Sequence, residues 1–506
     1  MYVEDDIVDI LNCSANIAKS DAIVPDDLRN ALKVAVAPLE DVPDRFKDWH
    51  PNSDEKVLDL VHPSLFPLVY GRSRGFVEKC VGLQDCVQFT GKGEVIPAPT
   101  EDQKRGFAME YCSTKFQWLP CEVAFTKDGD VEIQSYINNL HPVHHNQLYK
   151  VLEKLLVKAI PLWNRVLSGL DEKRTPRIDP ECAYYDFPDG QFSDREPESD
   201  DPDEEEDEDA YLEFRQDWIR AHRIVEQPDP DEYKSRDPGR PFDLRESFQN
   251  QGFQVIIKLA NIHLTPEKPK YDGGSWHVEG MLNEHICATA LYYYDNENIT
   301  DSHLYFRQKV YADALLSKQF EQNDSESVEV IYDVKDYGPA IQELGGVHTK
   351  EGRMLAFPNV LQHCVGPFEL ADKTKPGHRK IVAFFLVDPY IRVLSTANVP
   401  PQQRDWWAEV LSSENSKLSL LSGEILQHVV EDVEDFPISF NDAKVIREEL
   451  MKERGLNTEK VNGQSYIQVL WLHIGGMKAN VLQKLSCKIP SFSANTRLAR
   501  YIGLAE

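Results

Sequence analysis

The chain has 506 residues, of which 41% are hydrophobic, so it can bury a large core or several domains of ordinary size. Its formal net charge of −30 disfavours binding to the phosphates of nucleic acids, and no apolar run is long enough to cross a membrane. The N-terminus is acidic where a secretory or mitochondrial signal would be basic, so we expect a cytoplasmic protein, with a nuclear location as the alternative.

The first part of the chain predicts helices and one hairpin. We expect residues 1–115 to be mainly helical, because acidic residues precede helix formers at 26–36 and prolines mark the turns. Residues 116–185 predict a hairpin that turns at Asp128-Gly129, followed by a helix over about 144–170 with leucines at helical spacing. His141, His144 and His145 lie near the start of this helix. No carboxylate follows them at zinc-site spacing, so a metal site there is the less favoured interpretation.

Residues 186–245 predict a disordered acidic insert and a linker. The segment 193–209 holds twelve acidic residues and one arginine, and it lacks the apolar side chains that would offset the entropy of ordering. We interpret it as a solvated spacer. A docking site for a basic partner is the alternative.

Residues 246–395 predict a strand-rich core. Many short strands without intervening helices favour a sandwich or jelly roll. Residues 396–454 predict a C-terminal helical region, and the structure of the tail, 455–506, is not predicted by any pattern. The expected strands of the core lie at 253–264, around the His-x-Glu triplet, and at 285–294, 305–307, 328–332, 352–358, 363–367 and 379–387.

A candidate metal site lies in this core. On an extended strand, the side chains of His277 and Glu279 project to the same side. His363, which follows a Gly-x-x-x-x-Phe-Pro segment, is the third ligand we expect. Two neutral imidazoles and one carboxylate on one face of a metal leave three positions open, which suits ferrous iron in oxygenases.

The order of these motifs resembles the prolyl-4-hydroxylase-like branch of the iron and 2-oxoglutarate dependent dioxygenases. A His-x-Glu triplet, a strand ending in tyrosines, a distal histidine and a return strand that opens with Arg379 follow one another. The resemblance implies an α+β protein whose core, residues 246–395, is a double-stranded β-helix, a relative of the jelly roll. It also implies helical N- and C-terminal elaborations around that core.

The resemblance also implies roles for single residues. His277, Glu279 and His363 match the iron ligands and catalytic centre, and Arg379 matches the residue that pairs with the far carboxylate of 2-oxoglutarate. Tyr293 aligns with a tyrosine that hydrogen-bonds the same carboxylate, and Thr289 shares its strand face. The implied cofactors are Fe(II), 2-oxoglutarate as cosubstrate, and O2. Lys380 and His378 are the less favoured substitutes for Arg379.

Further phrases of the chain, from roughly residue 65 to 450, resemble a large, mainly fungal family of conserved proteins of uncharacterised function. The resemblance predicts a hydroxylase whose substrate is unknown, either a small molecule or a protein side chain. Two alternatives stay open. One is a catalytically silent jelly-roll binding module, and the other is a hydrolase that uses zinc in the same triad.

Overall fold

The computed structural model describes ten segments of the chain: 6–11, 16–76, 79–99, 111–168, 183–187, 214–231 without 216, 220 and 230, 241–309, 325–333, 341–413 and 421–463. The predicted acidic run at 193–209 and the tail beyond Gly463 lie outside these residues. None of the helices in the described segments has the length and apolar character that a membrane span needs.

The protein is a mixed α+β structure built on a large antiparallel sheet. This sheet has nine strands in the order β1-β2-β17-β14-β20-β12-β8-β9, and β3 pairs with β12 beside them. Most residues of its three longest strands are buried, and the apolar and aromatic runs within them suit strands that are covered on both faces. The strands of this sheet are β1 (Val8–Ile10), β2 (Ile17–Ser20), β3 (Val57–Val61), β8 (Cys121–Phe125), β9 (Val131–Ile133), β12 (Phe253–Leu264), β14 (Ile286–Glu297), β17 (Met354–Pro358) and β20 (Gly377–Val387).

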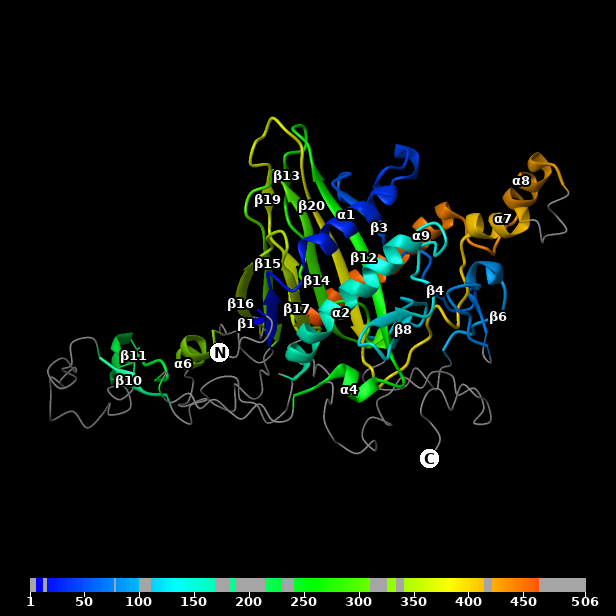
Figure 1. Cartoon of the computed structure of the whole chain (residues 1–506). Coiled ribbons are helices and arrows are strands. Elements are labelled where there is room, and N and C mark those ends of the chain that lie inside the picture. The colour runs from blue at the N-terminus through cyan, green and yellow to red at the C-terminus, as the bar shows by residue number, and fades with distance from the viewer. Residues whose placement is uncertain are drawn as a thin grey trace, which may run out of the picture.

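Helices cover the outer face of this sheet. In Figure 1, α1 (Asp26–Glu40) and α2 (Asn146–Ser168) cross in front of the strands. Asn261 of β12 donates to Glu40 of α1 at 2.7 Å, and Lys380 of β20 reaches the same carboxylate at 2.9 Å. Asn261 and Lys380 are paired across β12 and β20, so their side chains mark the outer face.

The inner face lies on the other side of the same strands. Ile262 pairs with Arg379, and Ile381 pairs with Tyr293, so these side chains alternate with the outer ones and point inward. A smaller three-stranded sheet, β16 (Ile341–His348), β15 (His303–Lys309) and β18 (Gln362–Val365), packs against this face. The two sheets meet, for example, at Phe306 on β15 and Phe357 on β17, whose ring centroids lie 5.0 Å apart.

The long C-terminal helix α9 (Phe440–Gly463) also contacts the inner face. It is drawn in orange behind the sheet in Figure 1. Its buried Arg447 binds Asp48 at 2.6 Å and lies 3.5 Å from Asp59, a residue of β3 that pairs with Ala260. The predicted helical region, 396–454, therefore continues to Gly463. Two shorter helices precede it, α7 (Arg404–Ser412) and α8 (Gly423–Glu431).

Smaller elements complete the described chain, and they correct one prediction. The region 1–115 is not mainly helical in its described part. It holds α1 and the short 3-10 helices η1 (Asp44–Phe46) and η2 (Cys86–Phe89), together with β1 to β3 and three two-residue strands. The remaining elements are β4 (Leu68–Val69), β5 (Arg74–Gly75), β6 (Glu94–Val95), β7 (Phe116–Gln117), β10 (Tyr185–Asp186), β11 (Ile224–Val225), β13 (Lys270–Tyr271), β19 (Phe368–Glu369), α4 (Leu244–Phe248) and the 3-10 helix η5 (Leu282–Glu284).

Two further predictions were wrong in the core. Residues 328–332 belong to a helix, α6 (Ser325–Tyr332), which packs beside β11, where Gln227 donates to the Val330 carbonyl at 2.7 Å. The run of Val and Ile there is too short for its period to separate helix from strand. The His-x-Glu triplet lies on no regular strand. Within it only His277 pairs with another strand, through an isolated bridge to His363.

Candidate metal centre

The backbone brings the two predicted histidine ligands side by side. His277 donates its N–H to the His363 carbonyl at 3.1 Å, and His363 donates back to the His277 carbonyl at 3.0 Å. Their rings lie 4.4 Å apart between centroids. The glycines around the triplet permit this approach, since Gly273 has a φ of +100° and a Cβ there would lie 2.8 Å from the Val365 carbonyl oxygen.

The side chain of Asn359 holds Glu279 against this pair. Its amide oxygen accepts from the Glu279 N–H at 2.8 Å, and its amide nitrogen donates to the Glu279 carbonyl at 2.8 Å. One side chain therefore replaces the backbone partners that a regular strand would have provided. The His-x-Glu residues converge even though they are not on a strand.

The three ligand atoms form a compact group. The Oε1 atom of Glu279 lies 3.3 Å from Nε2 of His363 and 3.7 Å from Nε2 of His277, and all three ligand atoms lie within 4.8 Å of one another. Metal bonds of about 2.1 Å at right angles would put neighbouring ligand atoms about 3 Å apart. The group is therefore close to the size that one ion requires.

The protonation of the group also suits a metal. The His277 Nδ1 lies 2.8 Å from the Ser275 carbonyl oxygen, which accepts only from a protonated Nδ1 and so leaves Nε2 free to bind. Burial alone would raise the pKa of Glu279, but the neighbouring His277 and His363 outweigh it and hold that pKa well below its usual range. Glu279 in turn outweighs the effect of burial on His277 and raises its pKa, so a metal at this histidine would compete with a proton. Burial lowers the pKa of His363, which favours the neutral imidazole.

Access to the group is one-sided. The side chains of His363 and Glu279 are 4% and 13% exposed, whereas that of His277 is 39% exposed. A ligand would therefore approach from the side of His277.

Arg379 is a buried cation without an acidic partner. It is 2% exposed, and in the described segments no carboxylate forms an ion pair with it. Its Nη1 has only long contacts, at 3.3 Å to Ser302 Oγ and 3.5 Å to Thr349 Oγ1, and its Nε has no hydrogen-bond partner among the described residues. Burial lowers its pKa. A buried guanidinium left in this state is costly unless an anion joins it.

The other predicted cosubstrate residues share the inner face with Arg379. Tyr293 places its ring 5.7 Å from the Arg379 guanidinium carbon, and burial raises the pKa of Tyr293 to about 12, so its hydroxyl stays protonated. Thr289 lies four residues earlier on the same strand face, and its buried hydroxyl has no hydrogen-bond partner among the described residues. The two predicted substitutes, Lys380 and His378, point to the outer face, where His378 lies 3.0 Å from Asp295.

Three residues that interact with His277, Arg379 or Glu279 were not predicted to belong to the site. Lys258 pairs with Ala383 on the inner face, and its charge acts on His277. A single lysine in the mainly apolar 253–264 strand was a signal for it. The hydroxyl of Tyr271 partly offsets the lowering of the Arg379 pKa by burial.

The third residue, Arg454 of α9, forms an ion pair with Glu284 at 2.5 Å, and its guanidinium lies 3.7 Å from the centre of the Trp118 ring. The negative charge of Glu279 favours the charged form of Arg454. No pattern near Tyr271 or Arg454 pointed to the site. The inner face therefore carries more positive charge than the sequence motifs predict.

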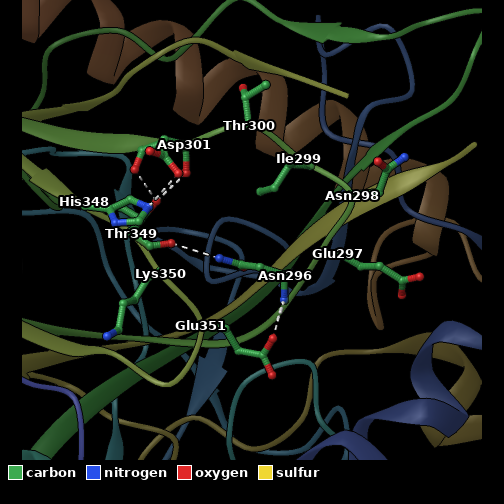
Figure 2. Close-up of a pocket in the computed structure, with 11 residues that line it drawn as sticks. Asn296, Glu297, Asn298, Ile299, Thr300, Asp301, His348, Thr349, Lys350 and Glu351 are labelled. Carbon is green, nitrogen blue, oxygen red and sulfur yellow. Dashed lines mark hydrogen bonds and ion pairs between the residues drawn. The ribbon is translucent and has the colours of Figure 1, made fainter. Parts of the chain in front are cut away.

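A surface pocket adjoins the far side of Arg379. Its volume is about 190 Å³, and its lining includes Ser302 and Thr349, the two residues whose hydroxyls contact the guanidinium. Figure 2 shows Asn296 donating to the Thr349 carbonyl and His348 facing Asp301 in this pocket. The two hydroxyls thus separate the pocket from the buried charge, and the pocket does not include the His277 group.

Comparison with known families shows the family of this chain. A family model described as "Protein of unknown function (DUF4246)" matches residues 1–410. The chain belongs to this family. The match includes the His277 group and Arg379, whereas α8 and α9 lie beyond it.

Other comparisons add little. No curated protein matches the chain. Among solved structures, the selenomethionine-labelled Fe(II)/(alpha)ketoglutarate-dependent dioxygenase TqaL is similar, with 14% identity and a TM-score of 0.17. The match covers 37% of this chain and 56% of that one, so the chain spans little more than half the length of this relative. Neither the family description nor this likeness carries an argument for activity.

Proposed function

We propose that this protein is an iron(II) and 2-oxoglutarate dependent dioxygenase, most simply a hydroxylase, with a double-stranded β-helix core. The observation that carries the proposal is Arg379, a buried guanidinium without an acidic partner in the described segments, on the same face as a compact His-Glu-His group. A planar guanidinium is suited to bind a carboxylate with two parallel hydrogen bonds.

The donor set fits ferrous iron. His277, Glu279 and His363 would hold the ion through two neutral imidazoles and one carboxylate, and the open side at His277 leaves room for other ligands. When bound, iron with 2-oxoglutarate and O2 supplies oxidising power, with release of succinate and carbon dioxide.

The other residues would position the cosubstrate. Arg379 would bind its far carboxylate, and the hydroxyl of Tyr293 would donate to it from the same sheet face. Thr289 does not fit its predicted role at this carboxylate, because it pairs with Phe385, six residues along β20 from Arg379, or about 20 Å away.

The alternatives explain less of the site. A zinc hydrolase would need the same three ligands, but it would give Arg379 no partner. A silent binding module would have no reason to keep three ligand atoms within 4.8 Å of one another with His277 in the metal-binding tautomer.

Iron binding and succinate release test the proposal. The wild-type protein, loaded anaerobically with Fe(II), should release succinate from 2-oxoglutarate on exposure to O2. His277→Ala and His363→Ala should each abolish stoichiometric iron binding and this turnover. His378→Ala is the matched control, because this histidine lies on the outer face. Full iron occupancy in both ligand variants would exclude the triad.

A further inference from the structure

A second group of possible metal ligands lies away from the His277 group. It joins His141 and His144, which precede α2, to Glu409 of α7. The Oε2 atom of Glu409 lies 3.4 Å from Nε2 of His141 and 3.4 Å from Nε2 of His144. No carboxylate follows these histidines at zinc-site spacing in the sequence, but the fold supplies one from a distant helix.

The dimensions of this group match a tetrahedral ion. Bonds of about 2.0–2.1 Å at tetrahedral angles separate neighbouring ligand atoms by about 3.3 Å, close to both observed distances. The His141 and His144 rings are stacked with centroids 3.8 Å apart and 15° between their planes, so binding of one ion through both Nε2 atoms requires the exposed ring of His144 to turn. Two histidines, one glutamate and a water form a common zinc ligand set.

The Nε2 atom of His141 faces Glu409. This atom is buried and has no hydrogen-bond partner among the described residues. The edge of Trp406 packs against the same ring at 4.5 Å between centroids, which limits the motion of the ring. Asp405 lies one turn before Glu409 on α7 and adds negative charge, which acts on Glu409.

We propose that His141, His144 and Glu409 bind a zinc-like divalent cation that fastens α7 to the start of α2. The competing explanation is a metal-free cluster. His141 Nδ1 accepts from the N–H groups of Val143 and His144 at 3.3 Å, which favours a proton on Nε2. Metal binding at Nε2 moves this proton to Nδ1 and gives up these two long contacts.

A third group, His50, Asp59 and His62, carries no such proposal. Its carboxylate already binds His50 at 2.7 Å and lies 3.5 Å from Arg447. The buried charges of this group are therefore compensated without an ion.

Cobalt titration of the full chain tests the proposal. The His277→Ala/His363→Ala background removes the first site, so any remaining stoichiometric site is separate from it. We expect one Co²⁺ per chain with the intense visible absorption of four-coordinate cobalt, and we expect zinc to displace it. In the same background, His144→Ala and Glu409→Gln should each weaken Co²⁺ binding at least about tenfold.

These two variants should fold, because the side chains of His144 and Glu409 are 54% and 44% exposed. His145→Ala and Glu431→Gln, on the adjacent residue and on α8, should keep the cobalt spectrum. Zinc should also raise the melting temperature of the background protein and leave that of its Glu409→Gln variant unchanged. Absence of cobalt uptake in the background, or an unchanged spectrum in both ligand variants, would show a metal-free cluster.

Discussion

Substitution of Arg379 separates a cosubstrate site from a silent scaffold. In the structure, Arg379 has two long hydroxyl contacts, lies over the Phe368 ring at 4.9 Å and has no acidic partner among the described residues, so Arg379→Ala breaks no ion pair of the ligand-free fold. It should instead leave the far carboxylate of 2-oxoglutarate buried and unpaired. Such a loss costs about 3–5 kcal/mol, or two to four decades in Kd.

Calorimetric titration of 2-oxoglutarate into the anaerobic iron protein measures this loss. Iron affinity should stay within error of the wild type, because Arg379 does not contact the triad. Lys380→Ala is the control on the neighbouring residue, and its side chain points to the outer face. Equal cosubstrate affinity in wild type and Arg379→Ala would refute the assignment.

Two stability predictions follow from other buried charges. Arg447→Ala should lower the free energy of unfolding by about 3–5 kcal/mol, because it leaves Asp48 buried without its closest cation. Lys444→Ala, 3.9 Å from Asp48, should cost less than about 1 kcal/mol. Equal losses in urea titrations would contradict this. Burial raises the pKa of Asp388 to about 6, so its neutral form stabilises the fold below pH 4, and this stabilisation is lost as pH rises through 6. The free energy of unfolding of Asp388→Asn, relative to that of the wild type, should increase by about 3 kcal/mol from pH 4 to pH 7.5. The same difference at both pH values would contradict a raised pKa of the Asp388 carboxyl.

The strands of the core were largely predictable, because their sequence pattern is local. The prediction for 253–264 coincides with β12, and that for 379–387 differs from β20 by two residues at its start. Alternation also placed Arg379 and Lys380 on opposite faces, as the contacts of Lys380 with Glu40 and Asp295 now show.

Predictions failed where tertiary contacts decide the conformation. The Val- and Ile-rich run of α6 forms a helix against β11, and the His-x-Glu segment is held by the side chain of Asn359 instead of a strand ladder. The triplet was still informative, because its ligand atoms converge on His363 without a regular strand. A short apolar run does not determine whether it forms a helix or a strand. The order of the His, Glu and His residues along the chain can be recognised without knowing the secondary structure.

Single residues from distant segments were the least predictable part of both sites. Glu409 completes a ligand group with His141 although no spacing rule connects α7 with the segment before α2. Likewise, Arg454 lies on α9, beyond the residues that the family model matches. It forms an ion pair with Glu284, and its charge interacts with that of Glu279. Because the charges of Arg454 and Glu279 interact, contacts of α9 bear on the charge of the proposed iron site. Motifs therefore locate the chemistry of this protein, and the packing of α7 and α9 determines which further charges surround it.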